Sequence, residues 1–137
     1  MTAKEFMNSY RRNGERIRQL EEEIAAIEET IGAKAIVYDS QPHGTDVGKP
    51  TEAMAMKLLE RKEQLEAMKY QLWKSRIRIE KVICMIDKTD YAEVLQRRYI
   101  RKQKFPEIAT EMHLSESGVL KIHGKALAYI SKLGSNG

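Results

Sequence analysis

Apolar side chains in the first third of the chain recur at a helical spacing. From Glu15 onward the intervals alternate between three and four residues, at Ile17, Leu20, Ile24, Ile27 and Ile31. This is the a/d pattern of a coiled-coil helix, because it places one apolar stripe along a single face. Phe6, Met7 and Tyr10 extend the stripe toward the N-terminus, with a bend or break expected at Asn13–Gly14.

A second apolar seam follows in the middle of the chain. Its members recur every seven residues, at Leu58, Leu65, Leu72, Ile79 and Ile86. Between the seams, residues 38–50 collect Pro, Gly, Asp, Ser and Thr without a period, which predicts a loop. The seams can pair as a hairpin within one chain or between two chains, since both arrangements bury the same residues. A two-helix hairpin has little core of its own, which favours a dimer built through this arm, residues 1–87.

After residue 87 the pattern changes to that of short, closely packed helices. Tyr91, Val94 and Leu95 begin an amphipathic helix that continues to Tyr99 and Ile100. A polar turn then leads into a helix over residues 105–112, whose first turn tolerates Pro106 because the missing N–H has no partner there. Ser115 is the candidate N-cap of a last helix that runs to about Lys132, and residues 134–137 are expected to form a flexible tail.

The spacing within these last two helices is typical of a helix-turn-helix. Ala109 is small where the second helix must cross the first at close range. His113 falls at the turn, where a left-handed conformation is needed and glycine is more usual. Leu114 is expected to fill the angle between the helices, with Val119 and Ile122 on the inner face. The sequence therefore predicts an all-α protein, with a coiled-coil arm followed by a helix-turn-helix module over residues 88–133.

Positive charge is concentrated in the same part of the chain. Residues 88–137 hold nine Lys and Arg against five Asp and Glu, whereas residues 1–50 hold seven against nine. A basic surface on a helix-turn-helix suits double-stranded DNA, with the start of the second helix at base edges in the major groove. The candidate base contacts are Ser115, Glu116, Ser117, Gly118 and Lys121. The candidate phosphate contacts, which position the module without reading sequence, are Arg97, Arg101, Lys102, Lys104 and Lys125.

Other chemistry is not indicated. Cys84 is the single cysteine and lies in an apolar run, which predicts a buried thiol in a reducing cytoplasm. The three histidines, His43, His113 and His123, are too far apart in sequence for a metal-ligand motif, and there is no glycine-rich phosphate loop or nucleophile motif. No segment has the length and apolarity of a membrane span. We therefore expect a cytoplasmic, non-enzymatic protein with no cofactor.

The C-terminal motif resembles a known family. Tyr91-x-x-Val94-Leu95-x-x-Arg98-Tyr99-Ile100, followed by Glu107-Ile108-Ala109, Leu114-Ser115, Val119 and Ala126-Leu127, is similar to the region 4 helix-turn-helix of sigma-70-type factors. Joined to a short helical arm, it resembles the ArpU/RinA-like regulators of phages and prophages. The resemblance implies a transcriptional regulator in a bacterial host cell that activates late genes, including packaging and lysis functions.

Two alternatives remain beside that function. A small terminase subunit also joins a helix-turn-helix to long oligomerising helices and recognises phage DNA for packaging, although its DNA module more often precedes the helices. A helical interaction protein is the other, since some modules similar to sigma region 4 bind RNA polymerase subunits or anti-sigma partners. The sequence decides neither the operator nor the direction of regulation.

Overall fold

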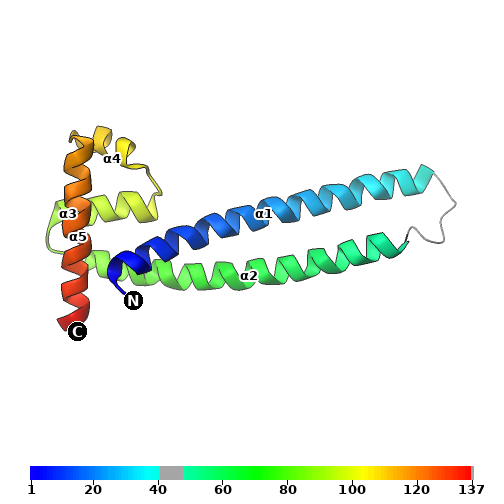
Figure 1. The fold of residues 1–137 in the computed structure, drawn as a ribbon, viewed down its shortest axis with the longest axis horizontal. Helices are drawn as coiled ribbons and strands as arrows, with labels where there is room; N and C mark the ends of the chain where they lie inside the picture. The colour runs from blue at the N-terminus through cyan, green and yellow to red at the C-terminus, as the bar shows by residue number, and fades with distance from the viewer. Residues whose placement is uncertain (41–47, 137) are drawn as a thin grey trace. The chain divides into compact units, whose positions relative to one another are not determined.

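The chain is helical in the part that the structure describes. The computed structural model describes the backbone of residues 1–40 and 48–136, and the side chains of residues 1–32 and 52–133. Figure 1 shows the elements in order: α1 (Ala3–Ser40), α2 (Gly48–Cys84), α3 (Thr89–Leu95), the π-helical segment η1 (Gln96–Ile100), α4 (Phe105–Met112) and α5 (Glu116–Asn136). No strand occurs within these described ranges, and the predicted all-α class is confirmed.

The long helices extend further than the apolar pattern predicted. α1 continues through Asn13–Gly14 without a break and ends at Ser40, and α2 begins at Gly48. These bounds correct the predicted loop of residues 38–50 at both ends, while residues 41–47 lie outside the described part. A single glycine costs a helix only about 1 kcal/mol, which a long, packed helix tolerates. α5 likewise continues to Asn136, beyond the predicted end at Lys132.

A reciprocal capping box begins α1. The Thr2 N–H donates to Glu5 Oε2 at 3.0 Å, and the Glu5 N–H donates to Thr2 Oγ1 at 3.1 Å. This arrangement satisfies two backbone donors that would otherwise lack a partner at the start of a helix. Local sequence chemistry therefore fixes where the first helix starts.

Two compact units make up the chain. One contains residues 13–72, and the other contains residues 1–12 together with residues 73–137. The division does not fall at residue 87, where the sequence pattern changes. The first turns of α1 and the last turns of α2 belong with the C-terminal helices.

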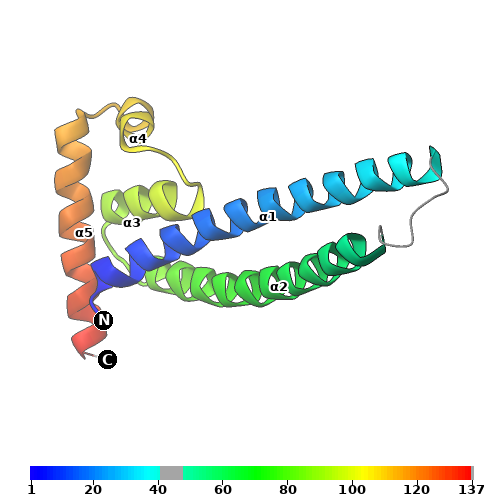
Figure 2. The same cartoon turned by 45° about the vertical axis from the view of Figure 1, so that its right-hand side comes forward.

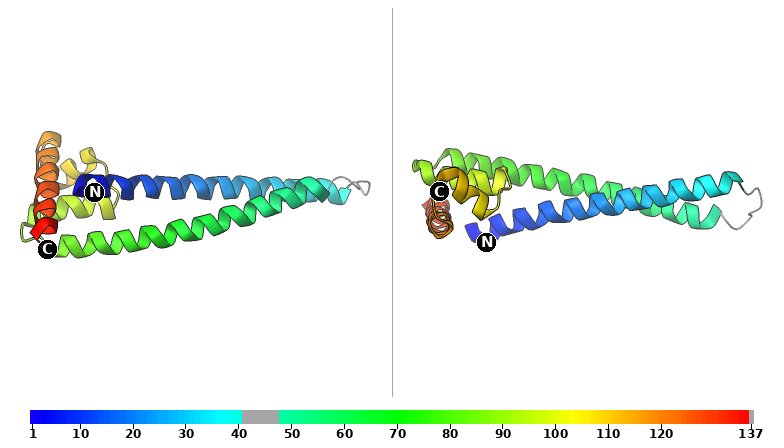
Figure 3. Two further views of the ribbon diagram at one scale, coloured as in Figure 1. Left: turned by 60° about the horizontal axis from the view of Figure 1, so that its bottom comes forward. Right: turned by 90° about the horizontal axis from the view of Figure 1, so that it is seen from above.

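In the unit of residues 13–72, α1 and α2 lie side by side as an antiparallel hairpin, as Figures 2 and 3 show from several directions. The buried side chains come from the predicted seams: Ile17, Leu20, Ile24 and Leu65, with Leu58, Met68 and Leu72 packed against them. Arg61, which lies between Leu58 and Leu65 on α2, is paired with Glu23 at 3.0 Å. The seams, which the sequence left free to pair within or between chains, thus pair within the chain.

The other unit has its own core, built where α3, α4 and α5 meet (Figure 1). Its buried members are Val94, Ile108, Ala109 and Val119, with Phe105, Met112 and Ile122 packed against them. Ala126 and Leu127 continue the buried face along α5. The predicted inward positions of Ala109, Val119 and Ile122 are confirmed.

Two residues that were predicted to be buried lie at the surface. Leu114 is 41% exposed, so the prediction that it fills the angle between the last two helices is wrong. Met112 and Ile122 pack into this core instead. Cys84 is also exposed, and the predicted buried thiol is wrong. Cys84 lies about one and a half helical turns after the buried Ile79, so the two side chains point in nearly opposite directions from α2. The apolar run in the sequence therefore did not indicate whether Cys84 is buried.

Candidate nucleic-acid interface

A short turn at residues 113–115 joins α4 to α5. His113 has a φ of 57° and a ψ of 42°, so the predicted left-handed conformation is confirmed. The His113 N–H donates to Thr110 O at 3.3 Å, and the Leu114 N–H donates to Ala109 O at 2.9 Å. These two bonds form a Schellman motif, which ends a helix sharply and redirects the chain. The turn therefore fixes the direction in which α5 leaves α4.

Ser115 caps the start of α5. Its Oγ accepts a hydrogen bond from the Gly118 N–H at 3.0 Å, which confirms the predicted N-cap. A Cβ at Gly118 would lie 3.1 Å from that oxygen, so a larger residue would press on the cap. Ser115 Oγ also lies 3.3 Å from Ser117 Oγ. Ser115 and Gly118, both predicted base contacts, thus also have a structural role in starting the helix.

The first two turns of α5 bury one face and expose the other. Val119 is fully buried, whereas the predicted base contacts Glu116, Ser117 and Lys121 are exposed. Residues three or four apart share a face of a helix. Ser117, Leu120, Lys121 and Gly124 therefore form one exposed strip, which we call the α5 outer strip. The sequence had singled out neither Leu120 nor Gly124.

Basic side chains gather on the turn that precedes α4. Arg101, Lys102 and Lys104, all predicted phosphate contacts, are exposed there, as is Lys125 on α5. Lys102 has a φ of 59°, a second left-handed residue that the sequence did not reveal. A bond from the Gln103 N–H to Arg97 O, 2.9 Å long, closes the turn. Residues 101–104, here called the basic turn, thus carry three cations within four residues.

Arg97 differs from the other predicted phosphate contacts. Its side chain is only 15% exposed, donates to Glu93 at 3.1 Å and is paired with Glu111. Gln103 Nε2 donates to the same Glu111 carboxylate at 2.9 Å. The guanidinium therefore ties α3 and η1 to α4, so the structure gives it an internal role and does not group it with the exposed cations.

Arg98 secures the start of α4. Its guanidinium carbon lies 3.9 Å from the centroid of the Phe105 ring, and Nη1 donates to Gln103 O at 3.1 Å. A cation over an aromatic face is attracted by the electron density of the ring. Burial, with a smaller effect from the Arg11 guanidinium, lowers the pKa of Arg98. The sequence indicated Arg98 only as one position of the motif that is similar to sigma region 4, and not as a contact of Phe105.

An aromatic cluster of the buried Tyr99 with the half-buried Phe105 and His123 holds α5 to η1. Tyr99 Oη and His123 Nε2 share a hydrogen bond of 2.7 Å, and the Phe105 ring meets the His123 ring edge-on at 5.1 Å. Burial lowers the pKa of His123, with smaller effects from Arg98, Lys4 and Arg11. Burial also raises the pKa of Tyr99. Both groups are therefore neutral in the folded protein near neutral pH.

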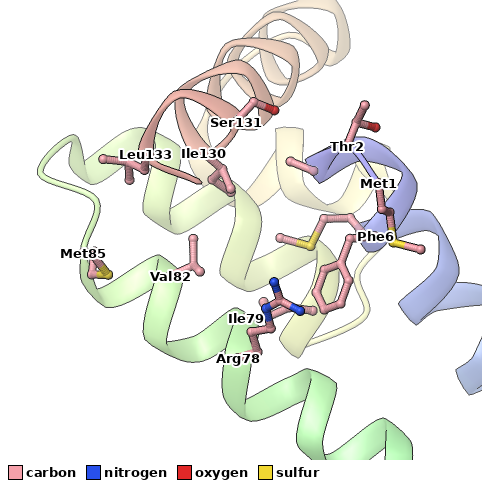
Figure 4. A pocket seen from close by; sticks show the side chains of 12 residues that line it. Met1, Thr2, Phe6, Arg78, Ile79, Val82, Met85, Ile130, Ser131 and Leu133 are labelled. Atoms are coloured by element: carbon pink, nitrogen blue, oxygen red, sulfur yellow. The ribbon is translucent and has the colours of Figure 1, made fainter. Parts of the chain in front are cut away.

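An apolar pocket of about 640 Å³ lies at the opposite end of α5. Figure 4 shows its lining from the start of α1, the end of α2 and the end of α5. Arg78 contributes a charged side chain to the lining, and its guanidinium carbon lies 5.0 Å from the centroid of the Phe6 ring. Among the described residues that line it, none carries a carboxylate, imidazole or thiol, so these residues provide no acid–base pair.

The remaining features concern metals and membranes. Among the side chains of residues 1–32 and 52–133, His, Cys, Asp and Glu form no group of three that could hold a metal ion. Of the helices described, none combines the length and the apolarity that a membrane span requires.

The architecture defines an all-α protein whose last helix presents an exposed strip. The chain belongs to the family described as "Protein of unknown function (DUF1492)", whose model matches residues 44–131. The matched range includes α2, α3, η1, α4 and most of α5. Comparisons with curated proteins and with solved structures found no match.

Proposed function

We propose that the protein is a sequence-specific DNA-binding regulator of transcription, with α4 and α5 as its helix-turn-helix. The observation that carries the proposal is the exposed start of α5 in the same unit as the basic turn. An α-helix fits the major groove of B-DNA, where each base pair presents a distinct pattern of donors and acceptors. The sharp turn at His113 supports this proposal, because it ends α4 directly before α5 and leaves the first residues of α5 exposed.

Each exposed group has chemistry that suits one part of the duplex. Glu116 can accept from the amino group of cytosine, and Lys121 can donate to guanine or to a phosphate. Ser117 can donate or accept. Arg101, Lys102, Lys104 and Lys125 would neutralise phosphates, which positions the module and makes its affinity fall with added salt. Arg97 is left out of this set because its guanidinium is paired within the module.

The finer assignment rests on resemblance. Likeness of residues 91–127 to sigma region 4, and of the whole to ArpU/RinA-like regulators, supports a phage or prophage activator of late genes that works in the cytoplasm of a bacterial host. We further propose a dimer, because two modules can then read two half-sites. Since Ile17, Leu20, Ile24 and Leu65 are buried within one hairpin, the contact between chains would use other surfaces.

The test is selection from random duplex DNA, followed by affinity measurement with a salt titration. We expect an enriched site, and we expect Lys121→Ala to weaken binding to it about 5- to 100-fold, the range for loss of a base contact. Lys69→Ala is the matched control, because Lys69 is exposed on α2 in the other unit. The proposal fails if no site is enriched, or if the two variants bind equally well.

Solution mass and a transcription reporter distinguish the alternatives. A ring of many chains, with no effect on the reporter, would favour a terminase subunit that recognises DNA for packaging. Binding to RNA polymerase without any selected DNA site would favour the interaction protein. A dimer that binds the selected site and raises transcription from it is the outcome expected for the proposed activator.

A further inference from the structure

Leu120 is a large apolar residue on the face of α5 that carries the predicted base contacts. It is 47% exposed, while its neighbour Val119 is fully buried in the core of the unit. A single exposed leucine is ordinary on a protein surface and needs no explanation by itself. What distinguishes Leu120 is its place in the α5 outer strip, between Ser117 and Lys121.

The residues around Leu120 leave it prominent. Ser117, one turn earlier, has a short side chain. Gly124, one turn later, has no side chain, and an added Cβ there would meet nothing within 4 Å. A glycine inside a helix costs about 1 kcal/mol relative to alanine, and here no neighbouring side chain requires it. The small residues Ser117 and Gly124 therefore flank Leu120 one turn before and one turn after it, which allows the surface of a partner to approach Leu120 closely.

In the major groove the apolar group available to such a side chain is the C5-methyl of thymine. A leucine has no donor or acceptor, so it cannot satisfy the polar edge of a guanine, adenine or cytosine. Covering those edges without a partner has a cost, whereas covering a methyl group is favourable. We propose that Leu120 is a specificity-determining residue that selects thymine by contact with its methyl group. This inference rests on the proposed function.

The experiment removes that methyl group alone. Each thymine of a selected duplex is replaced in turn by deoxyuridine, which keeps the same base pairing and the same polar edge. The affinity of every duplex is then measured for the unaltered protein, for Leu120→Ala and for Leu120→Met. Leu59→Ala is the control, because Leu59 is a similarly exposed leucine on α2, in the other unit.

One replacement is expected to weaken binding by the unaltered protein and by Leu59→Ala about fourfold, as expected for loss of one buried methyl group. Leu120→Ala should bind the original duplex more weakly and lose that sensitivity, while Leu120→Met should keep it. If a site is selected but every replacement affects Leu120→Ala and the unaltered protein equally, the role of Leu120 is wrong and DNA binding stands. If no site is selected, both proposals fall together.

Discussion

The left-handed turn at His113 gives the sharpest prediction about stability. The left-handed conformation costs a residue with a Cβ about 1–2 kcal/mol, and glycine avoids this cost. Glycine in turn loses about 0.5–1 kcal/mol through the greater freedom of its unfolded chain. With the observed φ of 57° and ψ of 42°, His113→Gly is therefore expected to stabilise the protein by up to about 1.5 kcal/mol.

Urea unfolding followed by far-UV circular dichroism measures this effect. The midpoint should rise for His113→Gly at an unchanged slope, because the surface exposed on unfolding is the same. His113→Val should lower the midpoint, since a β-branched residue is strained at positive φ. A midpoint for His113→Gly at or below that of the unaltered protein would refute the reasoning. DNA affinity should not fall in the glycine variant, because the turn that directs α5 is preserved.

Three further predictions concern other positions. Arg97→Ala should destabilise the protein by about 1–2 kcal/mol in urea unfolding, because its ion pairs are lost. Arg101→Ala should leave stability unchanged and lower the salt dependence of DNA binding by about one phosphate contact. The reverse result would contradict both assignments. Gly14→Ala and Gly124→Ala should each stabilise by about 0.5–1 kcal/mol, because an added Cβ meets nothing within 4 Å, but only Gly124→Ala should weaken DNA binding. Since burial lowers the pKa of His123, the unfolded state binds the proton more readily than the folded state. The contribution of the neutral His123 to the free energy of unfolding should therefore be fully present above pH 6.5 and decline as the pH falls below it. A similar decline in His123→Gln would contradict this.

The elements that follow from local chemistry were predictable from the sequence. The two seams give the buried faces of α1 and α2, since the period of apolar residues dictates which face is buried, although they left open whether those faces pair within one chain. Ser115 and His113 mark the start of α5 and the end of α4, because capping and left-handed turns depend on a few neighbouring residues. These features need no knowledge of distant parts of the chain.

Features that depend on tertiary packing were harder to predict. Leu114 and Met112 are both apolar and lie close to the turn, and only the packing of α4 on α5 decides which of them packs against the core. The pairing of Arg97 with Glu111, fourteen residues away, also depends on tertiary packing, and because of it Arg97 is not one of the exposed cations. The left-handed Lys102 comes shortly after the π-helical η1, where the Arg101 N–H bonds to Gln96 O at 3.0 Å, and no residue type in the sequence indicated its conformation.

Chemical-shift mapping of the backbone amides, during titration with a selected duplex, tests most directly whether the start of α5 contacts DNA. We expect the largest shifts on residues 115–125 and on the basic turn, with little change in residues 52–72 of the hairpin. A bound duplex that shifts the hairpin and leaves residues 115–125 unchanged would contradict DNA binding by the start of α5.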